Sequence, residues 1–454
     1  MEETTKTAAL LCGFGKREIT PPIGTPIVGY YRQRFMKGVI DPLFVRAAFF
    51  QSGDERAIVL TMDLCLLGKD WVLRIREKCA QAFGVDVDAI LVNGSHTHTG
   101  PLTGKDFASE LEVDPAYIDF LVEQAFCAAG EASVDLKPTR LFCAVTEAKG
   151  ISFVRRYRMK DGTYATNPGW KKHELIDCAV GTPNEELRIL KVQRDGADDV
   201  YMVNFGTHPD TVGGEYISAD WPGFVCSILE AAIPGSKGMF LLGPQGDVNH
   251  FNPFKENRGK VISEKAGEDY REAIAHARYM GRVIVGELLK VCDHMEEIGN
   301  EGISFASAEM QLPTNRSTEG LEEAIRINEI YYQHKDNWRE FGFSQAELAG
   351  ARRIIRMQSA PPYYSYNAFA LRIGDYVIAA GPGEAFTELG RRIYAASPFA
   401  HTMVLCMTNA SCGYVPAGSA YDEGGYEAST GSFSKGADDA YVDAVVKALN
   451  ALEG

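Results

Sequence analysis

The stretch AILVNGSHTHTGP, Ala89–Pro101, joins a short apolar run to two histidines flanked by hydroxyl side chains. The apolar run Ala89–Val92 predicts a buried strand that ends at the following Asn-Gly pair. Residues two apart in an extended chain point to one side, roughly 6–7 Å apart, so His96 and His98 emerge together at the mouth of the strand. Two imidazoles in this setting suit a metal ion and the group that it activates. A polar loop with histidines by chance is the alternative, which is not favoured with only 9 histidines among 454 residues.

A third histidine follows another predicted strand. The segment Val200–Phe205 reads as a strand, and the motif GTHPD, residues 206–210, comes directly after it. The proline restricts His208 to extended or turn geometry and ends the strand pairing there. His208 is therefore a candidate metal ligand. A loop histidine that only satisfies the backbone is an equally good interpretation of this motif taken alone.

Apolar runs of strand length alternate with segments of helical spacing, which indicates the α/β class. The predicted strands are Phe44–Gln51, Ala57–Met62, Ala89–Val92, Arg140–Glu147, Leu187–Val192, Val200–Phe205, Gly238–Leu242, Ile303–Leu312, Ala368–Ile373, Tyr376–Ala380 and Val404–Met407. The predicted helices are Trp71–Phe83, Ala116–Ala132, Pro222–Ala232, Ser263–Cys292 and Ala437–Leu452, with one more that begins near Glu384.

The sequence contains no low-complexity stretch, Ser/Pro linker or heptad run that would mark a domain boundary. We therefore expect a single catalytic domain over residues 1–454. Within it, Thr318–His334 and Ser344–Gln358 are charged and have helical spacing. They predict a helical hairpin at the surface, an excursion over residues 313–360.

The composition disfavours several kinds of partner. Lys and Arg number 46 against 61 Asp and Glu, a net charge of −15, so we expect no nucleic-acid binding and no stable membrane association. No window approaches the ~18–20 apolar residues of a membrane span. The 10 cysteines occur singly, without a CxxC pair, which fits a reducing compartment and predicts a cytoplasmic protein. Acidic α/β enzymes of this size are often homo-oligomers, although no interface is recognisable in the sequence.

Further short motifs follow the histidine motifs in a fixed order. They are ISAD (217–220), GDV (246–248), GPGE (381–384), GYV (413–415) and YEAST (426–430). Together with SHTHTGP and NFGTHPD, they resemble the successive motifs of the neutral (non-lysosomal) ceramidases. The resemblance runs from about Gly13 to Gly431, nearly the whole chain. It implies two packed mixed β-sheets flanked by helices.

The same resemblance implies one zinc ion per chain, held by His96, His208, Glu384 and Tyr414. Two imidazoles and a carboxylate are ordinary ligands of a catalytic zinc, whereas tyrosine is unusual because the metal must acidify its phenol. Without the resemblance, Tyr414 reads as a core or interface tyrosine and Glu384 as a carboxylate at a helix N-terminus. The resemblance also implies that His98 faces the substrate carbonyl. Spacing alone does not decide which histidine of the pair binds metal.

The segment Gly150–Tyr157 resembles the arginine loop of the family, in which Asn precedes the arginine. Here Val154 stands at that place, so Arg155 is the expected active-site arginine and Arg156 the neighbouring alternative, a substrate contact. A fixed guanidinium near the attacked carbonyl could stabilise an oxyanion or clamp a polar group. A surface salt bridge is the other interpretation. Tyr426 matches a tyrosine of the family that is expected to donate a hydrogen bond to substrate.

The segment GDVNH, residues 246–250, departs from the family, because ceramidases carry serine where this chain has Asn249. No GxSxG motif supplies a serine elsewhere. A metal-activated water is then the expected nucleophile, since zinc can lower its pKa to about 7. We expect Asp247 to support the ligands and Asn249 to contact the oxyanion or substrate. His250 either touches substrate or caps the loop.

The chain ends shortly after the YEAST segment, so we expect a short form without the C-terminal β-sandwich domain of ceramidases. Tyr31 and Trp221 are expected at the site entrance and suit a small, soluble molecule rather than ceramide. The sequence therefore predicts a zinc-dependent hydrolase of N-acyl (amide) bonds. A lactone, ester or sugar-derivative hydrolase on the same scaffold, a barrel-type amidohydrolase and a non-catalytic metal-binding or ligand-binding protein are the alternatives. The barrel is disfavoured, because there the HxH pair lies on the first strand.

Overall fold

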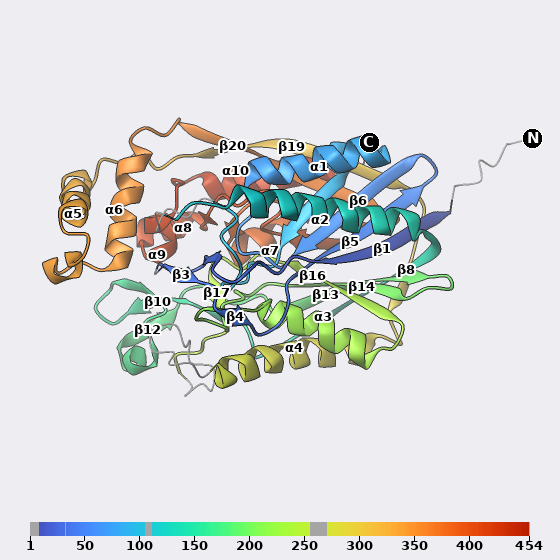
Figure 1. Cartoon of the computed structure of the whole chain (residues 1–454), viewed down its shortest axis with the longest axis horizontal. Helices are drawn as coiled ribbons and strands as arrows, with labels where there is room; N and C mark the ends of the chain where they lie inside the picture. The colour runs from blue at the N-terminus through green and yellow to red at the C-terminus, as the bar shows by residue number, and fades with distance from the viewer. Residues whose placement is uncertain (1–8, 32, 105–110, 255–269, 454) are drawn as a thin grey trace, which may run out of the picture.

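Apolar strands of mostly alternating direction build the larger of two β-sheets (Figure 1). We describe a computed structural model, in which residues 9–31, 33–104, 111–254 and 270–453 are described. The strands of this sheet are β1 (Leu10–Glu18), β5 (Phe44–Ser52), β6 (Glu55–Met62), β7 (Ile90–Gly94), β8 (Lys137–Glu147), β13 (Glu186–Arg194), β14 (Asp199–Phe205), β16 (Ser236–Leu242) and β18 (Glu296–Ile298). Their order is β16-β14-β13-β8-β1-β5-β6-β7, and β18 pairs with β8. The pairs β14–β16 and β6–β7 are parallel, so the sheet is mixed.

A second, four-stranded sheet packs against the first. Its strands are β19 (Ile303–Pro313), β20 (Tyr363–Ile373), β21 (Tyr376–Ala380) and β23 (His401–Leu405), in that order. Side chains alternate between its faces: Phe369 and Leu371 pack into the core with residues of β1, β5 and β6, whereas Ala368 and Ala370 belong to the core beneath the last helix. This alternation is the period of two that a strand buried on both faces requires.

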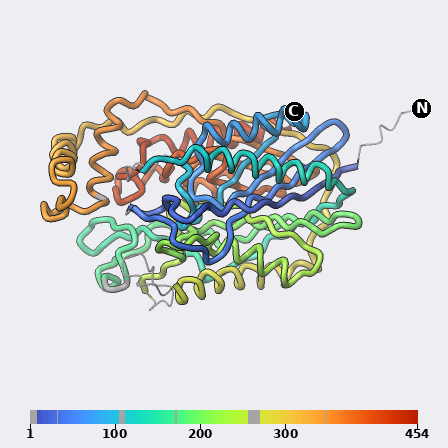
Figure 2. Tube along the Cα trace, in the orientation of Figure 1, coloured from blue at the N-terminus to red at the C-terminus, as the bar shows by residue number. Residues whose placement is uncertain are grey.

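Helices cover the outer faces of the two sheets (Figures 1 and 2). They are α1 (Lys69–Phe83), α2 (Pro115–Val134), α3 (Asp220–Ala232), α4 (Arg271–Val291), α7 (Thr387–Ala396) and α10 (Ala437–Asn450). Helix α2 lies along β1 and β5, α3 packs on β16 and α4, and α10 lies on β19 and β20. The predicted α/β class with two packed mixed sheets flanked by helices is confirmed. Among the described residues, no helix combines the length and the apolar character that crossing a bilayer requires.

The predicted strands and helices are found with shifted ends. The helix predicted over Ser263–Cys292 corresponds to α4, and residues 263–269 of that prediction lie outside the described residues. The helix predicted to begin near Glu384 is α7, which begins three residues later, at Thr387. Glu384 instead lies in a two-residue strand, where its backbone pairs with Tyr414. Such a short ladder leaves no periodic pattern in the sequence.

Several other short elements were not predicted. They are β2 (Pro26–Ile27), β3 (Arg34–Phe35), β4 (Gly38–Val39), β9 (Phe153–Val154), β10 (Arg156–Met159), β11 (Tyr164–Thr166), β12 (Ile176–Ala179), β15 (Tyr216–Ile217), β17 (Val248–Asn249), β22 (Glu384–Ala385), β24 (Tyr414–Val415), α8 (Gly418–Glu423), α9 (Tyr426–Thr430) and the 3-10 turns η1 (Val87–Ala89), η2 (Trp170–Leu175) and η3 (Trp338–Phe341). The pairs β9–β17 and β22–β24 bring together loops that carry most of the expected site residues.

Two further helices, α5 (Leu321–Gln333) and α6 (Gln345–Met357), project from one end of the molecule, in orange in Figures 1 and 2. The buried residues of this excursion form a small core of their own: Ala324, Ile327, Trp338, Phe343, Leu348 and Ala351. Helix α6 contacts α9, the segment that carries Tyr426. The hairpin of α5 and α6 therefore packs against a segment that carries an expected site residue.

The side chain of Asn93, at the end of β7, joins the two edges of the large sheet to the end of β23. Asn93 Oδ1 accepts a hydrogen bond of 2.9 Å from Leu242 N at the end of β16. Its Nδ2 donates to Cys406 O at 2.7 Å, and Cys406 N in turn donates to Leu242 O. A buried amide with both ends bonded fixes these three strands relative to one another.

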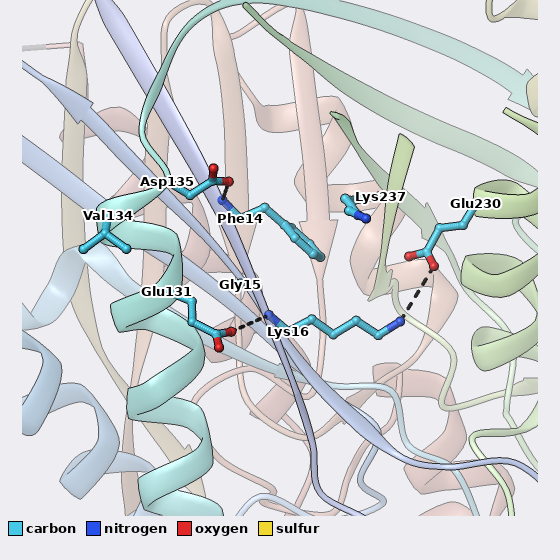
Figure 3. Close-up of a pocket in the computed structure, with 8 residues that line it drawn as sticks. All are labelled: Phe14, Gly15, Lys16, Glu131, Val134, Asp135, Glu230 and Lys237. Carbon is cyan, nitrogen blue, oxygen red and sulfur yellow. Dashed lines mark hydrogen bonds and ion pairs between the residues drawn. The ribbon is translucent and has the colours of Figure 1, made fainter. Parts of the chain in front are cut away.

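An open cavity of about 400 Å³ lies between α2, β1, α3 and β16 (Figure 3). In it, Lys16 Nζ lies 3.7 Å from Glu230 Oε2, and Glu131 accepts a hydrogen bond from Lys16 N. The lining is charged and contains none of the expected site residues, all of which are described. The candidate site is elsewhere.

Candidate metal centre

The imidazoles of His96 and His208 are both held through Nδ1 by backbone carbonyls. His96 Nδ1 lies 2.8 Å from Cys65 O, and His208 Nδ1 lies 3.0 Å from Gln245 O. A carbonyl oxygen only accepts, so Nδ1 of each ring donates the proton. In the neutral ring, Nε2 is then left with its lone pair, as in the metal-binding tautomer.

The loop after β7 turns sharply to aim His96. The backbone N–H of His96 donates to Leu64 O, and its φ of 67° is in the left-handed region that a non-glycine residue rarely adopts. Such strain persists only where the surrounding contacts impose it, and it clusters at functional sites. The sequence pattern predicted an extended chain here, which the backbone of His96 does not follow.

Both free Nε2 atoms converge on one carboxylate oxygen. Glu384 Oε2 lies 3.2 Å from His96 Nε2 and 3.2 Å from His208 Nε2. All three side chains are buried, and Glu384 Oε2 accepts no hydrogen bond within the described part of the chain. Three lone pairs that meet in a buried space are stabilised by a positive charge between them, which a metal ion or a proton on one imidazole supplies. Two imidazoles and a carboxylate are the donor set of a catalytic zinc, so these residues fit that ion.

The electrostatics of the three donors are strongly coupled. Burial raises the pKa of Glu384, but His96 and His208 outweigh burial and hold it well below its ordinary value. Burial and the nearby Arg155 guanidinium lower the pKa of His208. Burial alone would lower the pKa of His96, but Cys65 and Glu384 raise it well above its ordinary value. A proton and a metal ion therefore compete for His96.

Tyr414 lies beside these donors because β24 pairs in parallel with β22, with Tyr414 directly opposite Glu384. Its ring lies nearly parallel to that of His208, with the centroids 6.3 Å apart. Burial raises the pKa of Tyr414 well above its ordinary value, and Arg155, whose Cζ lies 5.2 Å from the ring centroid, opposes that shift. Ionisation of this phenol would need a further positive charge, which a metal ion supplies.

His98 points into the same space. His98 Nε2 lies 3.3 Å from His96 Nε2, and the ring centroid of His98 lies 5.5 Å from that of His208. Burial and the neighbouring His96 lower the pKa of His98 well below its ordinary value, so the ring is neutral. The structure thus brings both histidines of the HTH motif to one side.

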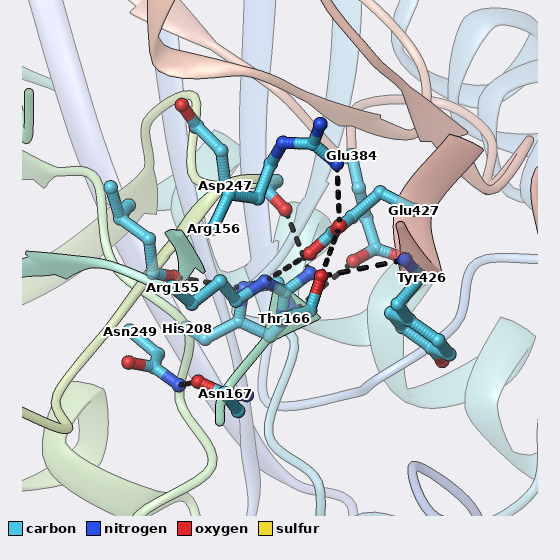
Figure 4. A network of polar contacts seen from close by, with 12 residues as sticks. Arg155, Arg156, Thr166, Asn167, His208, Asp247, Asn249, Glu384, Tyr426 and Glu427 are labelled. Carbon is cyan, nitrogen blue, oxygen red and sulfur yellow. Dashed lines mark hydrogen bonds and ion pairs between the residues drawn. The ribbon is translucent and has the colours of Figure 1, made fainter. Parts of the chain in front are cut away.

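Arg155 closes the site from the side of β10 (Figure 4). Its Nη1 lies 3.3 Å from His208 Nε2, and its Nη2 donates to Gly246 O at 2.7 Å. Its Nε lies 2.8 Å from Glu427 Oε1. Three fixed contacts hold the guanidinium with one nitrogen facing the metal donors.

Arg156 is turned away from the donors. Its Nη2 lies 2.9 Å from Glu423 Oε2, and its Nη1 donates to Gly424 O and lies 3.3 Å from Glu427 Oε2. The side chain is buried and ties β10 to the α8–α9 segment. Of the two arginines, only Arg155 is brought together with the histidines.

Glu427 is a site residue that the sequence analysis missed. Its side chain is fully buried, lies against both arginines and accepts a hydrogen bond of 2.8 Å from Thr166 Oγ1 (Figure 4). In the sequence it reads as an ordinary charge at the start of a short helix. Its position directly after Tyr426 was the one signal that could have singled it out.

Asp247 anchors the start of the helix that follows Glu384. Its Oδ1 accepts a hydrogen bond from Thr387 N and its Oδ2 one from Thr387 Oγ1, at 2.7 and 2.8 Å. Thr387 is the first residue of α7, so Asp247 fixes the helix that follows Glu384. Burial raises the pKa of Asp247. Its backbone carbonyl accepts from Arg155 N, and the carboxylate itself is directed at α7.

Asn249 stands where the resembling family carries serine, and its side chain makes hydrogen bonds to the surrounding loops. Its Nδ2 donates to Asn167 Oδ1 at 2.9 Å, and its Oδ1 accepts from Phe251 N at 3.0 Å (Figure 4). Asn167 N in turn donates to Arg155 O. The side chain of Asn249 therefore helps to place the loop that holds Arg155.

His250 is buried and lies 2.9 Å, from Nδ1 to Oδ1, from Asp210. Burial raises the pKa of Asp210, but His250 outweighs it and holds that pKa below its ordinary value. The structure thus pairs His250 with a carboxylate that the sequence analysis did not single out.

Aromatic side chains complete the site. Tyr426 contacts Tyr31 and Tyr414 edge to face, with centroids 6.0 and 5.7 Å apart. The expectation that Trp221 lines the entrance is wrong, because its side chain is fully buried and packs against Phe240 in the core. A large apolar ring at the start of α3 is stabilised there by burial.

Comparison with solved structures identifies the architecture. The crystal structure of neutral ceramidase from Pseudomonas aeruginosa aligns with a TM-score of 0.73 over 98% of this chain and 74% of its own, at 17% identity. The chain has a neutral ceramidase-like fold. A ceramidase complexed with C2 aligns with a TM-score of 0.72 over 98% of this chain and 75% of its own, at 16% identity. No family model and no curated protein matches the sequence. At such low identity the likeness concerns the neutral ceramidase-like fold, and residue roles rest on the geometry above.

Proposed function

We propose that this protein is a zinc-dependent hydrolase that cleaves an amide bond by metal-activated water. One zinc ion per chain would be held by His96, His208, Glu384 and Tyr414. The observation that carries the proposal is the convergence of two Nδ1-anchored imidazoles on one buried carboxylate oxygen, each at 3.2 Å. The neutral ceramidase-like fold supports the same reaction class.

When bound, a zinc ion polarises a carbonyl and lowers the pKa of water to about 7. The residues around it have separate tasks. The neutral His98 imidazole would donate a hydrogen bond to the carbonyl oxygen of the substrate. Arg155, fixed by Glu427, holds positive charge next to the space where an oxyanion develops. Tyr426 would donate a hydrogen bond that orients the substrate.

Asn249 supports water rather than a side chain as the nucleophile. Ceramidases carry serine at this position, and an amide cannot replace a hydroxyl in attack on a carbonyl. Here both ends of the amide group also make hydrogen bonds, one to Asn167 and one with Phe251 N. We therefore assign Asn249 a positioning role.

We further propose that the substrate is a small soluble N-acyl compound rather than ceramide. The imidazoles are buried, whereas Tyr31, Tyr414 and Tyr426 are partly exposed, so a substrate would approach past three phenols. Phenols offer hydroxyl groups as well as aromatic faces, which suit a polar molecule. All ten cysteines are free, which supports a reducing, cytoplasmic location.

The test combines metal analysis with substrate profiling. We expect one zinc per chain at the catalytic site, loss of activity on chelation and recovery when zinc is restored. We expect amides to be cleaved in preference to lactone, ester and glycoside panels. Glu384→Gln should lose this zinc, and His334→Ala, in the excursion, is the matched control. A zinc content in Glu384→Gln that is unchanged from the wild type, or activity that survives removal of zinc, would contradict the proposal. Preferential cleavage of lactones would show that the substrate is a lactone rather than an amide.

A further inference from the structure

A second group of potential metal ligands lies apart from the site above. Cys143 Sγ lies 3.3 Å from His401 Nδ1, and His401 Nε2 lies 3.9 Å from Glu296 Oε1. One ligand atom from each of the three residues falls within 4.8 Å of the others. A thiol, an imidazole and a carboxylate are all ligands of zinc.

The fold itself brings these residues together. Cys143 on β8 and Glu296 on β18 are direct cross-strand partners, so their side chains lie on the same face of the large sheet. His401 is the first residue of β23 and comes from the second sheet. The group therefore bridges the two sheets and does not depend on a loop.

The distance between sulfur and nitrogen suits a shared cation. Zinc binds sulfur at about 2.3 Å and nitrogen at about 2.0–2.1 Å, and two such ligands at a tetrahedral angle lie roughly 3.5 Å apart. The observed separation of Cys143 Sγ and His401 Nδ1 is 3.3 Å. An ion could bind between them with a small shift.

Burial decreases from the thiol to the carboxylate. Cys143 is 6% exposed, and the side chains of His401 and Glu296 are 24% and 67% exposed. An ion can thus reach the thiol from solvent past Glu296. This carboxylate now faces His401 Nε2, so its exposed side chain must turn toward Nδ1 to become the third ligand. Burial and Glu296 raise the pKa of the Cys143 thiol to about 11, so a bound cation would release its proton.

We propose that Cys143, His401 and Glu296 form a second site, for a thiophilic divalent cation such as Zn²⁺, with a fourth position open to water. Thiolate and carboxylate together balance the charge of the ion. The metal centre described above lies beyond the other end of β23, where Met407 N donates to Gly383 O. From His401 to Met407 an extended chain spans roughly 20 Å, so the two ions would be separate. This inference is independent of the proposed hydrolase activity.

In the experiment, a chelator first removes bound metal from the full-length protein, and Co²⁺ is then added. A thiolate ligand gives cobalt a near-ultraviolet charge-transfer band. We expect the band in the wild type and in His208→Ala, which removes a ligand of the other centre. Cys143→Ser and His401→Gln should abolish the band and lower the bound zinc by one ion per chain. Cys178→Ser, at an exposed cysteine, is the matched control.

The thiol nearest to the first centre needs its own control. Cys65 Sγ lies 3.8 Å from His96 Nδ1, so Cys65→Ser tests whether the band arises there. Absence of the band in the wild type, or a band that survives Cys143→Ser, would overturn the second site. Because the band is read in His208→Ala as well, its loss is distinguishable from failure of the proposed hydrolase function.

Discussion

Glu427 Oε1 lies 2.8 Å from Arg155 Nε, and both side chains are buried. The second oxygen of Glu427 lies 3.3 Å from Arg156 Nη1. One carboxylate on α9 therefore holds two guanidiniums from the β9–β10 segment. Through Glu427, the position of Arg155 at the metal donors depends on a helix that lies more than 250 residues later in the chain.

Glu427→Gln should destabilise the protein by about 3–5 kcal/mol, because an amide leaves two buried guanidiniums without this counter-charge. The free energy of unfolding in urea measures the loss. Glu423→Gln is the control, since this carboxylate also pairs with Arg156 but its side chain is 20% exposed. Equal losses in the two variants would show that burial of Glu427 is not the cause.

His98→Ala should lower turnover by ~10²–10³ while the protein keeps its catalytic zinc, because in the proposed function the imidazole acts on the substrate rather than on the ion. Turnover and metal content are measured on the same preparation. His96→Ala, by contrast, should lose the ion. If His98→Ala lost the ion as well, His98 would be a ligand, as its 3.3 Å approach to His96 Nε2 allows.

Asn249→Ala should reduce turnover by at most about tenfold, because it removes two neutral hydrogen bonds that position a loop, one to Asn167 and one from Phe251 N, each typically 0.5–1.5 kcal/mol. The wild type should also accumulate no covalent acyl-enzyme in a rapid-quench experiment. A pre-steady-state burst with a covalent adduct would instead reveal a side-chain nucleophile.

His276 on α4 should make the protein less stable in acid. Burial, with His250 5.3 Å away between ring centroids, lowers its pKa from 6.5 to about 4. Below pH 6.5 the unfolded chain binds a proton there that the folded chain does not, so stability falls as the pH drops toward 4, by up to about 3 kcal/mol. His276→Gln should remove that part of the fall in unfolding free energy. An unchanged pH dependence in the variant would contradict this assignment.

The long elements of the fold were predictable from the sequence because their side chains repeat. Strands such as β19 and helices such as α1 bury one face, and burial leaves a period of two or of about 3.6 residues. The two-residue ladders β9–β17 and β22–β24 have no room for a period. They form because the loops around them are already fixed, which is tertiary information.

The same distinction, between local sequence patterns and tertiary contacts, decides which site residues could be predicted. His96, His98 and His208 follow strong strand signals, so their placement at strand ends could be derived from local patterns. Glu384 and Tyr414 came from the family resemblance, because a lone carboxylate or phenol has no distinctive spacing. Glu427 escaped both arguments, since its importance depends on two arginines that are distant in the sequence.

The amide of Asn93 has a consequence for solubility. Exposed edge strands are templates for pairing with another chain and hence for aggregation. Here the end of β16 donates to Asn93, and β7 is covered by Met407 and Asn409, whose backbone groups bond to Gly94 and Val92. Replacing Asn93 by an apolar residue would weaken the contacts at both sheet edges, β16 and β7, at once. We would then expect self-association on heating, well before any loss of helix content.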